Sequence, residues 1–174
     1  TMQGKSKITG TRTAIGAAAA DSTSGAPGIR INLLEDSQLV GLGKRYNEIS
    51  NDTDKDAVLP GIVFNGGNTS GVAALTMSDS SKITGYQVGI YFYECGNEVI
   101  LFMEDDTAVE QNRDHGISER DVSRSSGVIN MTLTMKHNAR ISGNGIHGIY
   151  LGSQQQILTE GTKKIILEDN AVVG

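Results

Sequence analysis

The chain has 174 residues, a formal net charge of −5, 37 % apolar residues, 22 glycines, two prolines and one cysteine, Cys95. This length suffices for one domain with a hydrophobic core, and a single cysteine excludes an internal disulfide framework. The acidic charge argues against a general nucleic-acid binder, and the apolar runs are too short for a membrane span.

The predicted elements are short strands that follow one another in a three-strand round, repeated about six times along the chain. Set A, the first strand of each round, is expected at Ile31–Leu34, Ala74–Met77, Ile100–Met103, Thr132–Met135 and Lys164–Leu167, with Thr1 and Met2 as the tail of another. Set B follows at Ser6–Gly10, Ser37–Gly41, Ser81–Gly85, Thr107–Gln111, Ala139–Gly143 and Asn170–Gly174. Set C follows at Gly61–Phe64, Gly89–Phe92, Gly116–Glu119 and Gly148–Leu151, and more weakly at Ala14–Ala17.

The spacing within the round predicts which residues form the core. From the end of each set A strand to the glycine of set B, the distance alternates between 8 and 7 residues, with Glu110 in the glycine position of the fourth round. Because side chains alternate between the two faces of a strand, one parity of each set should point inward. The expected inward residues are Leu75, Met77, Leu133, Met135, Ile165 and Leu167 in set A, Ile8, Leu39, Ile83, Ala108, Ile141 and Val172 in set B, and Ile62, Ile90, Ile117 and Ile149 in set C.

Three short strands per round with constant turns predict an all-β solenoid, a right-handed parallel β-helix of about six coils. A β-sandwich or a propeller is the alternative, but a sandwich would need hairpin turns such as Asn-Gly between these strands, and they are not joined that way. We expect a single domain over residues 1–174, with a long inserted loop at about 42–60. The chain begins and ends inside predicted strands, which favours a piece of a longer rod or end-to-end association through uncapped coils.

The segments "LTMSDSSKITG", "LTMKHNARISGNGIHGIYL" and "GIYF/GIYL" resemble the repeats of bacterial cell-surface proteins with the pectin-lyase-like β-helix, which are polymorphic-membrane-protein-like or autotransporter-like adhesins. The resemblance implies an extracellular or cell-surface location, although the first residues carry no signal peptide. It also implies a structural, adhesive or carbohydrate-facing role, and it transfers no catalytic residue.

The inserted loop contains a candidate calcium site. Asp52, Asp54 and Asp56 alternate in "NDTDKDA", a spacing that can wrap oxygen ligands around Ca²⁺. Ala57 stands where such a loop needs glycine, and Val63 stands where it needs the final glutamate. A solvated acidic loop is therefore the favoured interpretation, Ca²⁺ binding is the alternative, and no other cofactor is expected.

A second group of carboxylates lies at the corner between sets A and B. Glu104 and Asp106 are weak candidates for a catalytic acid pair, because glycoside hydrolases use two carboxylates that flank the scissile bond. Similar acidic residues recur at this corner in "LEDS" and "LEDN". Turn capping, in which Asp and Asn side chains bind backbone N–H groups, explains all of them.

Set C carries candidate ligand-binding residues. His115 and His147 precede its glycine in successive rounds, so coils in register would stack their imidazoles one rung apart. The pair could bind a metal with Asp114 or His137, or it could be a side-chain ladder at a corner. Tyr91 and Tyr150 are expected to face outward in one row, where aromatic rings can stack on sugars or simply occupy the surface of a strand.

The sequence thus predicts a structural or adhesive segment that presents loops and a ladder face to a host or matrix carbohydrate or protein. A carbohydrate-active enzyme of the same fold, either a polysaccharide lyase or a glycoside hydrolase, is the alternative. Ice binding is a third hypothesis, which rests on the Thr-x-Thr pair Thr132 and Thr134.

Overall fold

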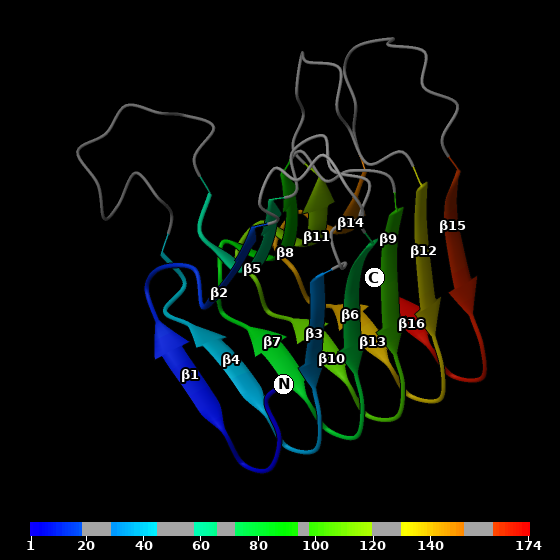
Figure 1. The fold of residues 1–174 in the computed structure, drawn as a ribbon, viewed down its shortest axis with the longest axis horizontal. Helices are drawn as coiled ribbons and strands as arrows, with labels where there is room; N and C mark the ends of the chain where they lie inside the picture. Colours follow the sequence, from blue (N-terminus) through cyan, green and yellow to red (C-terminus); the bar gives the residue numbers. More distant parts are fainter. Residues whose placement is uncertain (19–28, 45–57, 66–71, 94–97, 120–129, 152–161) are drawn as a thin grey trace, which may run out of the picture.

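The computed structural model is a three-sided solenoid of stacked parallel strands (Figure 1). The structure describes residues 1–18, 29–44, 58–65, 72–93, 98–119, 130–151 and 162–174. The described residues contain no helix, and hence none that is long and apolar enough to cross a membrane. The predicted parallel β-helix of about six coils is therefore confirmed.

Each predicted set forms one parallel sheet. Sheet A consists of β3 (Ile29–Leu33), β6 (Val72–Met77), β9 (Glu98–Met103), β12 (Asn130–Met135) and β15 (Lys163–Leu167). Sheet B consists of β1 (Lys7–Gly10), β4 (Gln38–Gly41), β7 (Lys82–Thr84), β10 (Ala108–Glu110), β13 (Arg140–Ser142) and β16 (Val172–Val173). Sheet C consists of β2 (Ile15–Ala18), β5 (Pro60–Asn65), β8 (Val88–Tyr93), β11 (His115–Glu119) and β14 (His147–Tyr150).

The strand register places like residues in columns that run along the solenoid. Met77 pairs with Met103, which pairs with Met135, and all three are buried. In sheet C the column Ile62, Ile90 and Ile117 is fully buried, and the rings of Phe64 and Phe92 stack with centroids 5.4 Å apart. Such columns give each coil a core through contacts with its two neighbours alone.

The register also corrects three assignments by one residue. Leu33, not Leu34, pairs with Met77 at the end of set A. The column of Ile83 and Ile141 continues through Val109 instead of Ala108, and through Val173 instead of Val172. Ala108 is nevertheless fully buried, whereas Val172 is 52 % exposed. Each error falls on two adjacent apolar residues, where composition does not tell which one faces the core, and a slip of one residue exchanges the faces.

With these corrections, the distance from the end of set A to the set B turn is 8 residues in each of the first five rounds, and the predicted alternation with 7 is wrong. Gly41 follows Leu33 by 8 residues, and Gln111 follows Met103 by 8 residues. Gln111 therefore stands in the glycine position that the sequence suggested for Glu110. Its φ of 55° lies in the left-handed region, as do the φ angles of Gly85 and Gly143 in the neighbouring coils.

Glycine at the start of set C is required by packing across the corner between sheets B and C. A Cβ atom on Gly89 would lie 2.6 Å from the Val109 side chain and 2.6 Å from the Gly116 carbonyl oxygen. No side chain fits at these distances, so the glycine lets one coil rest on the next.

The last strand of sheet A, β15, is less well covered than its neighbours. Ile165 and Leu167 pair in register with Leu133 and Met135, as predicted for inward positions. Because no described coil lies beyond them, Ile165 is 45 % and Leu167 47 % exposed, whereas Leu133 and Met135 are fully buried.

Candidate functional site

The calcium hypothesis falls on a part of the chain that the structure does not describe. Asp52, Asp54 and Asp56 lie outside the described residues, as do Cys95 and most of the inserted loop. Among the described residues, no three His, Cys, Asp or Glu side chains are grouped to hold a metal ion.

The corner between sheets A and B is a column of left-handed residues, one per coil. The φ angles of Gly4, Glu35, Asp79, Asp105, His137 and Asp169 lie between 56° and 67°. Each of these residues stands two positions after the end of its set A strand. Asp and His tolerate this conformation better than β-branched residues do, which accounts for the composition of the corner.

Carboxylates in this column bind backbone N–H groups of the neighbouring coil. The Glu35 N–H donates to Asp79 Oδ2 at 2.9 Å, and the Asp79 N–H donates to Asp105 Oδ2 at 3.3 Å. The Glu35 N–H, together with the Ser78 hydroxyl, holds the pKa of Asp79 below its usual value. These contacts are those of a capped turn, extended from one coil to the next.

The weak catalytic candidates lie in the same corner. Asp106 Oδ1 accepts a hydrogen bond of 3.0 Å from Asn138 Nδ2, and Asn138 in turn accepts one of 3.3 Å from Asn170 Nδ2. Asp106 is thus part of an exposed side-chain ladder that links three coils. Glu104 immediately follows β9 and is half-buried. The geometry gives the corner a structural role and offers no specific support for acid catalysis by this pair.

The two histidines of set C are brought together as predicted. His115 pairs in register with His147, their Nδ1 atoms are 3.3 Å apart, and their ring centroids are 5.2 Å apart. Tyr150 completes the group, at 5.2 Å from His115 and 5.5 Å from His147. We name these three rings the sheet C ring cluster.

The ring planes decide what this cluster can bind. The planes of His115 and His147 are only 15° from parallel, and the rings are stacked. Imidazole binds a metal through a lone pair in the plane of the ring. Two stacked, nearly parallel rings cannot both aim such lone pairs at one ion, so the pair fits a ladder better than a metal site.

The proposed third ligands are occupied elsewhere. His137 Nδ1 is 2.9 Å from Asp105 Oδ1 at the corner between sheets A and B. Asp114 is buried, accepts a hydrogen bond of 3.0 Å from Gln87 Nε2 and raises the pKa of His115. Burial and the neighbouring His147 outweigh that effect, so the pKa of His115 is lowered and the ring stays neutral at pH 7.

The predicted exposed tyrosine row is only partly correct. Tyr91 and Tyr150 belong to one column, which runs from Val63 through Tyr91 and Ser118. However, Tyr91 is only 7 % exposed and Ser118 only 5 %. Strand parity identified the column but could not tell that Tyr91 is covered, so of the two tyrosines Tyr150 alone offers a partly exposed ring.

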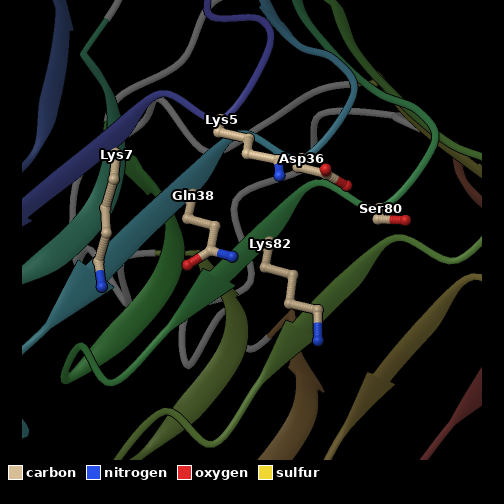
Figure 2. Close-up of a pocket in the computed structure, with 6 residues that line it drawn as sticks. All are labelled: Lys5, Lys7, Asp36, Gln38, Ser80 and Lys82. Carbon is tan, nitrogen blue, oxygen red and sulfur yellow. The ribbon is translucent and has the colours of Figure 1, made fainter.

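The outer face of sheet B carries a polar surface that the sequence did not indicate as a site. A shallow cavity of about 390 Å³ is lined by Lys5, Lys7, Asp36, Gln38, Ser80 and Lys82 (Figure 2). We name it the sheet B groove. The signal was present in the repeat, because Lys7 and Lys82 occupy the same place in the two "SKITG" segments and point away from the core.

Next to the groove, one carboxylate joins two cations. Glu110 Oε1 is 3.5 Å from Lys82 Nζ, and Glu110 Oε2 accepts a hydrogen bond of 2.9 Å from Arg140 Nε. Partial burial by itself raises the pKa of Glu110, but Arg140 and Lys82 together hold it below its usual value.

A buried carboxylate also pairs with a partly exposed lysine. Glu119 continues the column of Phe92 in sheet C and is 4 % exposed, and Lys163 continues the column of Met131 in sheet A. Lys163 Nζ forms an ion pair with Glu119 Oε2. Both residues occupy places that hold apolar side chains in other coils, and the pair links sheet C to sheet A.

The comparisons with known proteins add no family: no family model, curated protein or solved structure matches this chain. The geometry of the described residues therefore carries the functional argument.

Proposed function

We propose that this chain is a structural and adhesive segment of an extracellular or cell-surface bacterial protein, and that the outer face of sheet C binds carbohydrate. The observation that carries the proposal is the sheet C ring cluster, in which three rings from two successive coils stack within 5.5 Å of one another. The resemblance of the repeats to those of pectin-lyase-like surface proteins supports the same class of function.

The chemistry of the cluster suits a sugar face. Aromatic rings present large apolar surfaces with polar edges, which match the C–H face and the hydroxyl rim of a pyranose. The lowered pKa of His115 keeps that ring uncharged at neutral pH. Placement on rigid strands fixes the rings before binding, which reduces the entropy cost of recognition.

A panel of immobilised glycans would test this proposal. We expect Tyr150→Ala to weaken binding to the recognised glycan by about tenfold, and Tyr150→Phe to retain most of it because the ring face remains. His137→Ala is the matched control, because this histidine lies at the corner between sheets A and B. Equal binding by wild type and Tyr150→Ala would contradict a role for the cluster.

The same panel addresses the enzymatic alternative. If soluble sugar or unsaturated uronate were released from a bound polysaccharide, and Glu104→Gln or Asp106→Asn abolished the release, the segment would be a carbohydrate-active enzyme. We expect binding without release, because Asp106 already forms part of a side-chain ladder.

The acidic loop adds a separate proposal, in which Asp52, Asp54 and Asp56 bind Ca²⁺. Binding to the native state alone would raise the melting temperature in millimolar calcium. An unchanged melting temperature, or an equal rise in a variant with all three aspartates replaced by asparagine, would exclude this site.

A further inference from the structure

The sheet B groove is built from two parallel rows of three residues, and each row crosses the first three coils. Lys7, Gln38 and Lys82 form one row in strand register, on β1, β4 and β7. Figure 2 shows Lys5, Asp36 and Ser80 as the second row, at the corner where these strands begin. Because strands in a sheet lie about 4.8 Å apart, the lysines of the first and third coils are separated by roughly 10 Å.

The groove is positively charged within an acidic protein. Three lysines and one carboxylate line it, whereas the whole chain has a net charge of −5. Lys5 and Lys7 form no ion pair with any residue that the structure describes. Lys82 has Glu110 at 3.5 Å, but Arg140 shares that carboxylate at a shorter distance. Cationic capacity thus remains available for a ligand.

The residues between the lysines narrow the choice of ligand. Gln38 both donates and accepts hydrogen bonds, Ser80 does the same through its hydroxyl, and Asp36 when ionised only accepts. A hydroxyl-bearing polymer can satisfy Asp36 by donating to it. A DNA backbone offers no hydroxyl donor and an acidic peptide offers only its backbone N–H groups, so a dense polyanion of either kind has fewer donors to offset repulsion from Asp36.

We infer that the sheet B groove is a binding site for an acidic polysaccharide, whose anionic groups contact the lysines and whose hydroxyls contact Asp36, Gln38 and Ser80. A polysaccharide extended across the strands would contact one lysine, then the polar Gln38, and then a second lysine. The site lies on a different sheet from the sheet C ring cluster and does not depend on carbohydrate binding there.

The test measures binding to the whole chain by calorimetry without calcium. The probes are alginate oligomers, dextran sulfate and uncharged dextran, with polyglutamate and anionic lipid vesicles as anionic ligands of other classes. Lys5→Gln combined with Lys7→Gln removes two charges of the groove. Arg30→Gln combined with Lys164→Gln is the charge-matched control, because both residues lie at outward positions of sheet A. The melting temperature of each variant confirms that it is folded.

We expect alginate, dextran sulfate or both to bind, and dextran not to bind. The Lys5 and Lys7 double variant should bind about tenfold more weakly, the control should bind as wild type does, and salt should weaken the interaction. Binding to one polymer alone identifies carboxylate or sulfate as the anionic group that the groove selects.

Three outcomes would overturn the inference. These are equal weakening by the control variant, no binding of either anionic polymer, and equal or tighter binding of polyglutamate or anionic lipid vesicles. Asp36→Asn gives a further check, since it should improve polyglutamate binding and should not improve alginate binding. Tyr150→Ala should leave anionic-polymer binding unchanged, so failure at the sheet C ring cluster and failure at the sheet B groove are distinguishable.

Discussion

Single side chains at the turns form hydrogen bonds that hold one coil on the next. Asn112, at the turn between sheets B and C, is 2 % exposed, and its Oδ1 accepts a hydrogen bond of 3.1 Å from the Tyr86 N–H. Its Nδ2 donates to Asn144 Oδ1 at 3.0 Å, and Asn144 Nδ2 donates to the Val109 carbonyl at 3.3 Å. The amide column thus satisfies buried backbone groups in successive coils.

Asn112→Ala should lower the free energy of unfolding by about 2–3 kcal/mol, because it leaves the buried Tyr86 N–H without an acceptor. Asn138→Ala is the matched control, since this asparagine belongs to the exposed ladder with Asp106, and it should cost less than about 1 kcal/mol. Urea unfolding of the two variants measures the difference. Equal losses would show that burial of the column is not what makes it stabilising.

A substitution at Tyr86 should raise the free energy of unfolding instead of lowering it. Its side chain is 2 % exposed, and its hydroxyl has no hydrogen-bond partner in the part of the chain that the structure describes. Burial raises the pKa of Tyr86 to about 12. Tyr86→Phe removes this buried polar atom and keeps the ring, so we expect thermal unfolding to show a gain of about 1 kcal/mol. A loss of that size would indicate that the hydroxyl is solvated or bonded in solution.

The pair His115 and His147 makes stability depend on pH. The folded pKa of His115 is lowered, first by burial and then by the charge of His147, while the unfolded value is about 6.5. The unfolded chain therefore binds the proton first, so this contribution is complete above about pH 6.5 and is lost as the pH falls toward the folded pKa. His147→Gln should raise the pKa of His115, as followed by NMR of its ring protons. An unchanged pKa would mean that burial alone lowers it.

At the scale of elements, the repeat predicted the three sheets, and burial decided the register. Four-residue apolar segments with one spacing suffice to identify strands that stack in parallel. Leu33 with Leu34, Ala108 with Val109 and Val172 with Val173 are pairs of adjacent apolar residues, so composition could not assign their faces. The burial of Tyr91 was inaccessible, because it depends on which side chains meet across coils. The shared place of Lys7 and Lys82 could be read from the two "SKITG" segments, but the approach of Lys5 to them could not.

In sheet A, the loss of stability caused by a truncation should follow how deeply the side chain is buried along its column. Leu133→Ala removes a fully buried side chain with covered neighbours on both sides, and should cost about 3 kcal/mol. Ile165→Ala in the next coil of the same column should cost about 1 kcal/mol, because this side chain is 45 % exposed. Chemical denaturation compares the two variants. An equally large loss at Ile165 would indicate that another surface covers it in solution.

At the scale of the whole molecule, the three sheets share one core and present different outer faces. Sheet C presents the stacked rings of His115, His147 and Tyr150, and sheet B presents the lysines of its groove. The outward neighbours of Thr132 and Thr134 in sheet A are Ile100 and Phe102, so the pair is not continued as a threonine ladder. Regular rows of threonine, on which the ice-binding hypothesis depends, are therefore missing from these described strands.

The arrangement of coils also predicts how the molecule opens. In a solenoid each coil contacts only its neighbours, so local unfolding proceeds from the outer coils inward. In sheet B, β4, β7, β10 and β13 are all hydrogen-bonded on both sides. Of these, β4 and β13 lie one coil from the ends of the sheet, and β7 and β10 lie two coils from them. Amide hydrogen exchange by mass spectrometry should therefore be faster in β4 and β13 than in β7 and β10. Because all four strands are bonded on both sides, the difference would report the stability of coils and not the presence of a bond. Equal protection in all four would mean instead that the six coils unfold as one cooperative unit, because the coupling between neighbouring coils outweighs the differences in stability between them.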